Sequence, residues 1–199
     1  LQQTQVATVI PYYRRFIASF PTVAALATAS QEQVLAHWSG LGYYARGRNL
    51  HRAAQLIVEK YHGEFPREFE QIFELPGIGR STAAAICALA YHERCAILDG
   101  NVKRVLARYC GISGLSSSSA VKAQLWQQAE ALLPHRDVAS YTQALMDMGA
   151  TICTRSKPKC GACPAQADCE ACQTQRVHEL PTPRLRKIAP EKRTKFLLL

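Results

Sequence analysis

Apolar residues recur three and four positions apart along most of the chain, the spacing of one face of an α-helix. Near the start this pattern predicts an amphipathic helix that is interrupted or kinked at Pro11, whose ring removes a backbone donor. No strand pattern of useful length precedes residue 195, so the sequence predicts an all-α fold. The apolar positions of the first helix are Val6, Val9, Ile10, Tyr13, Phe16 and Ile17.

Start signals and periodicity predict the later helices. Ser30 and Gln33 have the Ser-x-x-Gln form of a capping box, which opens a helix through Trp38. A loop rich in Gly and Ser at 113–119 separates two groups of helices. The other helical stretches are 50–60, 102–109, 120–133 and 138–149.

Residues 75–79 read Leu-Pro-Gly-Ile-Gly and break the helical pattern just before the apolar run 83–90. Gly77 and Gly79 permit backbone angles and a close approach that a side chain would forbid. The backbone N–H groups and dipole of the next helix favour an anion, and Arg80 adds a full positive charge. The stretch predicts a phosphate seat, with a plain interhelical turn as the alternative.

Asp99 is a lone carboxylate that follows the apolar residues 96–98 and precedes a helix carrying Lys103, Arg104 and Arg108. An acid set among bases is a candidate catalytic group. Because Asp is also a preferred N-cap, the alternative is a purely structural cap, and the two roles are compatible.

Two further stretches carry side chains suited to nucleic acid. Tyr43 follows two glycines and precedes Arg46, and an aromatic wedge of this kind can kink or open a duplex. The alternative is a tyrosine packed at a helix junction. Gln2 and Gln3 can donate to and accept from base edges, although a solvated helix start explains them equally.

Four cysteines, Cys153, Cys160, Cys163 and Cys169, are spaced C-x6-C-x2-C-x5-C. In a cytosolic chain such a loop favours a metal centre over disulfides. From the residues alone, zinc held by four thiolates and an iron–sulfur cluster both stay open. Cys172 lies close to this loop but is one thiol too many for a site with four ligands.

Composition narrows the class of protein. A chain of 199 residues with 48% hydrophobic and 20% charged residues is typical of a soluble globular protein, and no apolar run approaches a membrane span. We expect a cytoplasmic protein, associated with the nucleoid if it is bacterial. The missing initiator Met and the final apolar run at 196–199 predict a fragment at both ends.

The formal charge of +9 favours a polyanionic partner. Most of the excess lies in residues 151–199, with ten Lys or Arg against four Asp or Glu. Lys157 lies inside the first cysteine interval between two other cations, where a protruding loop can clamp phosphate.

Taken together, residues 1–5, 40–46, 75–82, 97–104 and 152–160 resemble the MutY-type adenine DNA glycosylases of the endonuclease III superfamily. The resemblance implies a helix-hairpin-helix DNA glycosylase fold with a six-helix barrel domain and a helical iron–sulfur domain. It also implies a [4Fe–4S] cluster on the four spaced cysteines. The implied domains are 1–110, with the hairpin at about 68–90; 111–175, with the cluster loop at 153–169; and 176–199, a basic linker and the start of a MutT-like domain.

The resemblance implies hydrolysis of the N-glycosidic bond of adenine mispaired with 8-oxoguanine or guanine in double-stranded DNA, by a monomer. Asp99 would stabilise the sugar cation, Asn101 would orient the sugar-phosphate backbone, and Ser81 would line the site. Ser81 stands where bifunctional relatives carry a Lys, which implies a monofunctional enzyme. The Glu that protonates adenine would lie upstream of residue 1.

The implied DNA contacts extend over the whole chain. Two alternatives stay open, an endonuclease III-like pyrimidine glycosylase and lyase, and a non-catalytic iron–sulfur module that binds DNA. An upstream Glu would decide for an adenine-removing enzyme. The predicted DNA-binding residues are Gln2, Gln3, Tyr43, Arg46, Leu75, Gly77, Gly79, Arg80 and Lys157.

Overall fold

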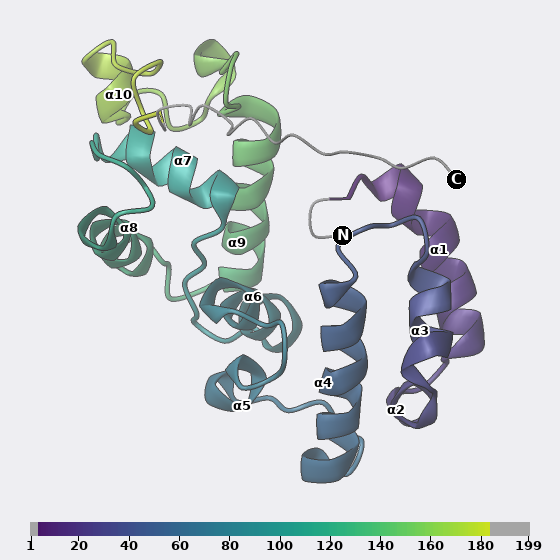
Figure 1. The fold of residues 1–199 in the computed structure, drawn as a ribbon. Coiled ribbons are helices and arrows are strands. Elements are labelled where there is room, and N and C mark those ends of the chain that lie inside the picture. Colours follow the sequence, from purple (N-terminus) through teal and green to yellow (C-terminus); the bar gives the residue numbers. More distant parts are fainter. Residues whose placement is uncertain (1–3, 184–199) are drawn as a thin grey trace, which may run out of the picture. The chain divides into compact units, whose positions relative to one another are not determined.

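The computed structural model describes residues 4–183, and every regular element in that range is a helix (Figure 1). The predicted all-α class is therefore confirmed. The predictions for Gln2, Gln3 and the final apolar run at 196–199 fall outside the described residues. The α-helices are α1 (Val6–Ser19), α2 (Val23–Thr28), α3 (Gln31–Trp38), α4 (Ala45–Tyr61), α5 (Phe69–Phe73), α6 (Arg80–Tyr91), α7 (Gly100–Tyr109), α8 (Ser119–Ala131), α9 (Val138–Asp147) and α10 (Glu170–Gln173).

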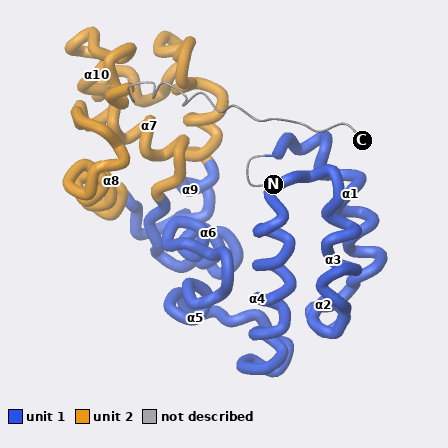
Figure 2. Tube along the Cα trace, viewed as in Figure 1, with its two compact units in different colours: residues 1–97, 133–143 blue, residues 98–132, 144–199 orange. Residues whose placement is uncertain are grey.

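Two compact units make up the chain (Figure 2). Unit 1 comprises residues 1–97 and 133–143, and unit 2 comprises residues 98–132 and 144–199. Each unit combines two segments that are separated in the sequence. The domain boundaries inferred from the sequence stay a prediction.

Unit 1 is built around α4, which packs against both α2 and α3. Leu26, Val34 and Ala54 form one buried cluster, and Ala53, Ile57 and Leu75 form a second. Because α4 contributes to both clusters, it carries core residues on two of its faces. The predicted capping box at the start of α3 is confirmed, with Ser30 and Gln33 bonded reciprocally.

Helix α1 runs through Pro11 without interruption. Of the two predicted outcomes, the interruption is therefore wrong and the kink stays a prediction. A proline within a helix removes one backbone donor, and the remaining hydrogen bonds of α1 continue on both sides of it. The helix ends at Ser19, and the N–H of Phe20 closes its last turn on the carbonyl of Phe16 at 2.8 Å.

Unit 2 is organised around α7, which packs against α8, α10 and the π-helical turn η1 (Met148–Ile152). Its buried face includes Val102, Val105 and Leu106, and it also carries the buried side chain of Arg108. A short 3-10 helix, η2 (Cys160–Ala162), lies in the cysteine loop. Helix α7 therefore places polar residues against the segment that holds the spaced cysteines.

The beginning of the predicted linker is packed into unit 2. Leu180 is 2% exposed, and Thr182 accepts a hydrogen bond from the backbone N–H of Gly114 at 2.8 Å. Arg176 donates to Ser113 at 2.7 Å. These contacts attach residues 176–182 to the loop between α7 and α8.

Candidate functional site

The predicted phosphate seat is a tight turn between α5 and α6. Gly77 has φ +81°, and a Cβ at this position would lie 2.8 Å from Cβ of Asn49. The N–H of Ile78 closes the turn by donating to the carbonyl of Leu75 at 3.1 Å. Both the backbone angle and the close approach therefore require glycine at position 77.

Gly79 is a different case from Gly77. Its φ of −93° is available to any residue, so the expected need for an unusual backbone angle is wrong here. It is the N-cap of α6, and a Cβ built on it would meet nothing within 4 Å. Position 79 thus opens to space outside the protein at a helix N-terminus. Arg80, the first residue of α6, is exposed beside it.

Asp99 caps the N-terminus of α7. Its Oδ1 accepts the backbone N–H of Val102 at 2.7 Å, and its carbonyl accepts that of Lys103 at 2.9 Å. Asp99 is therefore an N-cap, the structural alternative that its position before a helix predicted. The cap uses one oxygen of the carboxylate, and the side chain is half-buried. A carboxylate held in this way keeps a second oxygen for another partner.

Asn101 is connected to the cysteine loop through Arg104. Nη2 of Arg104 donates to Oδ1 of Asn101 at 2.8 Å and to the carbonyl of Gly149 at 2.6 Å. Nε of Arg104 donates to the carbonyl of Cys153 at 2.7 Å. A Cβ on Gly149 would lie 2.6 Å from Cβ of Asn101, so η1 can approach α7 this closely only with glycine there.

This linking role of Arg104 was not predicted from the sequence, where the residue counted only as a nearby base. Burial lowers the pKa of Arg104, and the positive charge of Arg108 lowers it further. The one available signal was its position three residues after Asn101, which places both on one face of α7.

Tyr43 lies in the turn before α4, and Arg46 is the second residue of that helix. Tyr43 is 68% exposed and has φ 48°, so it is not packed at a helix junction. Arg46 is half-buried, with its guanidinium 5.7 Å from the ring of Tyr43 and 5.5 Å from that of Trp38. It also donates to the carbonyls of Leu41 and Gly42, each at 3.3 Å. Arg46 therefore holds the turn that presents Tyr43.

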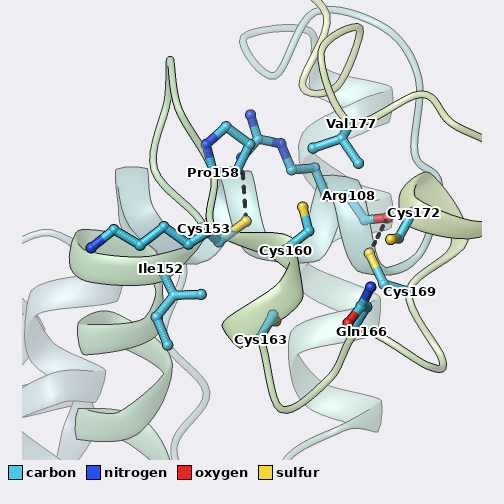
Figure 3. Close-up of a pocket in the computed structure, with 11 residues that line it drawn as sticks. Arg108, Ile152, Cys153, Pro158, Cys160, Cys163, Gln166, Cys169, Cys172 and Val177 are labelled. Atoms are coloured by element: carbon cyan, nitrogen blue, oxygen red, sulfur yellow. Dashed lines mark hydrogen bonds between the residues drawn. The ribbon is translucent and has the colours of Figure 1, made fainter.

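The four spaced cysteines line one pocket in unit 2 (Figure 3). Cys172, excluded from the predicted ligand set, lines the same pocket, and so does Arg108. Soft sulfur donors are thus gathered at one place from η2, α10 and the connecting loops. Among the described residues, no group of three or more His, Cys, Asp or Glu is arranged to hold a single metal ion.

Arg108 fastens the cysteine loop to α7. The side chain is 3% exposed, and its Nη1 donates to Sγ of Cys153 at 3.3 Å and to the carbonyl of Thr154 at 2.7 Å. Its Nε donates to the carbonyl of Leu180 at 2.7 Å. A buried guanidinium with this many acceptors fixes the loop geometry and places positive charge beside a thiol.

Two of the clustered thiols, Cys160 and Cys169, have a raised pKa. Burial raises the pKa of Cys160, and the neighbouring thiols of Cys172, Cys153 and Cys169 raise it further. Burial also raises the pKa of Cys169, against hydrogen bonds from the backbone of Cys172 and Ala171 that lower it. Metal cations reverse such shifts, because a coordinating thiol is held as thiolate.

The loop between Cys153 and Cys160 presents its cations outward. Arg155, Lys157 and Lys159 are all exposed. The hydroxyl of Thr154 donates to the carbonyl of Lys157 at 2.7 Å and shapes the loop.

Ser81 belongs to unit 1, where it is the half-buried second residue of α6.

Residues 1–131 match the sequence profile described as HhH-GPD superfamily base excision DNA repair protein. The chain belongs to this superfamily. Among solved structures, the HhH-GPD chain is similar to a thermostable thymine-DNA glycosylase, with a TM-score of 0.78 and 28% identity over 87% of this chain and 80% of the other. A trapped endonuclease III–DNA covalent intermediate has a TM-score of 0.73 at 22% identity over the same shares, which shows the fold alone. The predicted helix-hairpin-helix glycosylase fold is confirmed.

Curated relatives of the HhH-GPD chain include adenine DNA glycosylases. That of Buchnera aphidicola (Acyrthosiphon pisum) is 43% identical over 199 residues, which cover 100% of this chain and 57% of the relative. That of Homo sapiens is 45% identical over 180 residues, which cover 90% of this chain and 33% of the relative. The resemblance inferred from the motifs is confirmed, and the chain spans little more than half of the Buchnera relative. No helix among the described residues is long and apolar enough to cross a membrane.

Proposed function

We propose that the protein containing this chain removes adenine from mispaired double-stranded DNA by hydrolysing its N-glycosidic bond. The observation that carries the proposal is similarity to adenine DNA glycosylases over all 199 residues, at 43% identity in the Buchnera relative. That similarity includes the stretch in which Asp99 caps α7. The proposed mispairs are adenine with 8-oxoguanine and adenine with guanine.

Asp99 is the proposed catalytic carboxylate. Cleavage of the N-glycosidic bond develops positive charge on the sugar, and a fixed carboxylate stabilises that charge, as the second carboxylate does in glycoside hydrolysis. The 2.7 Å bond from the N–H of Val102 holds one oxygen of Asp99 and thereby orients the other. Protonation of adenine is assigned to the Glu that the family resemblance places upstream of residue 1.

Asn101 is the proposed contact to the sugar-phosphate backbone. Its side-chain oxygen already accepts a hydrogen bond from Arg104, so the amide NH₂ is the group that remains to donate to an acceptor on DNA. Arg104 acts through Asn101 and is a positioning residue. Ser81, which lies in unit 1, is carried over from the family resemblance as a further site residue.

DNA binding is assigned to three exposed features. The helix start at Gly79 and Arg80 takes a backbone phosphate, and Lys157 with its neighbouring cations takes another. Tyr43, 68% exposed on a turn held by Arg46, enters the stack while adenine leaves it, since the glycosidic bond is reached only in a flipped nucleotide. Leu75 and Gly77 shape the hairpin, and Gln2 and Gln3 remain predicted base contacts.

The proposed cofactor is a [4Fe–4S] cluster on Cys153, Cys160, Cys163 and Cys169. All four line one pocket, and Arg108 donates to Sγ of Cys153, the kind of hydrogen bond that tunes cluster thiolates. Such a cluster, when bound, holds the cationic loop in shape. Purified protein should contain about four iron and four sulfide per chain. Stoichiometric zinc without sulfide would refute the cluster.

The decisive assay is single-turnover release of base by the chain extended upstream through the proposed Glu. Expected is release of free adenine from duplexes with A opposite 8-oxoguanine or G, and none from the A:T duplex. Release of an oxidised pyrimidine with strand cleavage would replace the proposal by an endonuclease III-like activity. Tight binding of the mispaired duplex without release of any base would point to a non-catalytic module.

Borohydride trapping tests the monofunctional part of the proposal. A hydroxyl cannot form the Schiff base that an amine forms with the sugar, so Ser81 should yield no trapped adduct. Trapping by wild type and by Ser81→Ala should be equally low. Efficient trapping that Ser81→Ala abolishes would contradict this assignment.

A further inference from the structure

Cys172 is a fifth thiol at the proposed cluster pocket. It lies in α10, three residues after Cys169, and lines the pocket together with the four spaced cysteines. In Figure 3 the labelled sulfurs of Cys169 and Cys172 lie next to each other on the same side of the drawn site. Cys172 is not in a disulfide.

Helix geometry makes Cys169 and Cys172 neighbours. Cys169 is the N-cap of α10, and the backbone N–H of Cys172 donates to its carbonyl at 2.9 Å. Side chains three residues apart in a helical turn lie on the same face. Cys172 also lines the same pocket as Cys160 and Cys169.

The turn that carries both thiols is fixed in place. Ala171 between them is fully buried, and α10 packs against α7. Gly111, just after α7, approaches Glu170 so closely that a Cβ there would lie 2.5 Å from its Cγ. Exchange between Cys169 and Cys172 therefore requires rotation of two side chains within one helical turn and no rearrangement of the loop.

The other proposed ligands lack such a partner in the turn that carries them. Sγ of Cys153 accepts a hydrogen bond from Arg108. Cys160 is the first residue of the short helix η2 and Cys163 is its C-cap, so this turn already supplies two proposed ligands. Sγ of Cys169 instead donates weakly to the carbonyl of Arg108 at 3.5 Å. Cys169 is the position that Cys172 can replace.

We propose that Cys172 is a reserve ligand that takes over the iron held by Cys169. In the exchange one Fe–Sγ bond to Cys169 breaks and one Fe–Sγ bond to Cys172 forms. The Cys172 thiol gives up its proton to solvent and the released Cys169 thiolate takes one, with no change in oxidation state. The proposal rests on the proposed [4Fe–4S] cluster, and it would keep the cluster in place when Cys169 is oxidised or lost.

Iron and sulfide content, measured on anaerobically purified protein, tests the proposal. The variants are Cys169→Ala, Cys172→Ala, the double variant, and Cys163→Ala as the matched control. Cys169→Ala should retain at least about half of the wild-type iron. The double variant and Cys163→Ala should each retain at most about one fifth of the iron that Cys169→Ala retains. Electron paramagnetic resonance of Cys169→Ala should differ from wild type, because the ligand at one iron has moved.

Loss of iron from Cys169→Ala equal to the loss from Cys163→Ala would overturn the reserve-ligand proposal while leaving the cluster intact as an assignment. Wild-type protein without iron and sulfide would overturn both. Where Cys169→Ala is insoluble, iron release to a chelator after mild oxidation is compared between wild type and Cys172→Ala. Faster release from Cys172→Ala supports the proposal, and equal rates overturn it.

Discussion

Arg104 and Asn101 share a 2.8 Å hydrogen bond between guanidinium and side-chain oxygen, while the same guanidinium reaches the carbonyl of Cys153 at 2.7 Å. One side chain thus connects the proposed DNA contact with the first cysteine of the cysteine loop. The planar fork of arginine serves both acceptors in one fixed geometry, whereas the compact ammonium group of lysine offers no such rigid fork. A disturbance of the cysteine loop should therefore reach Asn101 through Arg104.

Replacing Arg104→Lys should weaken both connections. At least one buried acceptor loses its partner, which should lower the free energy of unfolding by about 1–3 kcal/mol. Adenine release should slow while the affinity for duplex DNA changes less, because the lost interaction positions Asn101. Circular dichroism melting and single-turnover release measure the two effects. The exposed Arg136→Lys is the control, and an equal change in both variants would contradict the link.

Asp99 can be separated into its two roles by two substitutions. Asn is as good an N-cap as Asp, so the free energy of unfolding of Asp99→Asn should lie within about 0.5 kcal/mol of wild type. That of Asp99→Ala should be lower by about 1 kcal/mol. Both should lose adenine release by about 10²–10⁴-fold, since neither keeps the negative charge. Release by Asp99→Asn at the wild-type rate would show that Asp99 is only a cap.

Substitution by Ala should lower stability at Gly77 but not at Gly79. Gly77→Ala places a Cβ 2.8 Å from Asn49 at φ +81°, and should lower the free energy of unfolding by about 1–3 kcal/mol. Gly79→Ala meets no atom within 4 Å and should stay within about 1 kcal/mol of wild type. Its effect should appear instead as weaker binding of duplex DNA. Equal melting temperatures for the two variants would contradict the assigned turn.

Cys87 should make stability depend on pH in the alkaline range. Burial raises the pKa of its thiol from 9.0 to about 11, with a smaller contribution from the neighbouring Cys95. Between these values the unfolded chain loses the thiol proton and the folded chain keeps it, so the stabilisation present below pH 9 is lost as pH rises toward 11.

The measurement for Cys87 is urea unfolding of wild type and Cys87→Ala from pH 8 to pH 11. The advantage of wild type should be constant below about pH 9 and should shrink above it. The comparison cancels the titration of lysines and tyrosines, which both proteins share. A constant difference across the range would show that the thiol ionises equally in both states.

Local signals were sufficient for the helices and for the positions of several key residues. The capping box at Ser30, the cap at Asp99 and the turn at Gly77 each depend on contacts within a few residues, so short-range backbone rules predict them. The spacing of four cysteines likewise showed that they belong together. The proline in α1 misled the prediction, because its cost is one hydrogen bond in a helix with many.

Tertiary structure alone decided which side chains connect these local features. Arg104 and Cys153 are 49 residues apart, and Arg108 and Leu180 are 72 apart, so no local pattern predicts their hydrogen bonds. The hydrogen bond from Arg46 to Thr4, 42 residues away, and the place of Cys172 in the pocket also depend on how segments pack. The sequence by itself determined the elements and the chemistry they carry, because these follow from short-range geometry. The partners of the buried guanidinium groups followed only from packing, because buried polar groups are mostly hydrogen-bonded to whatever acceptors the fold brings beside them.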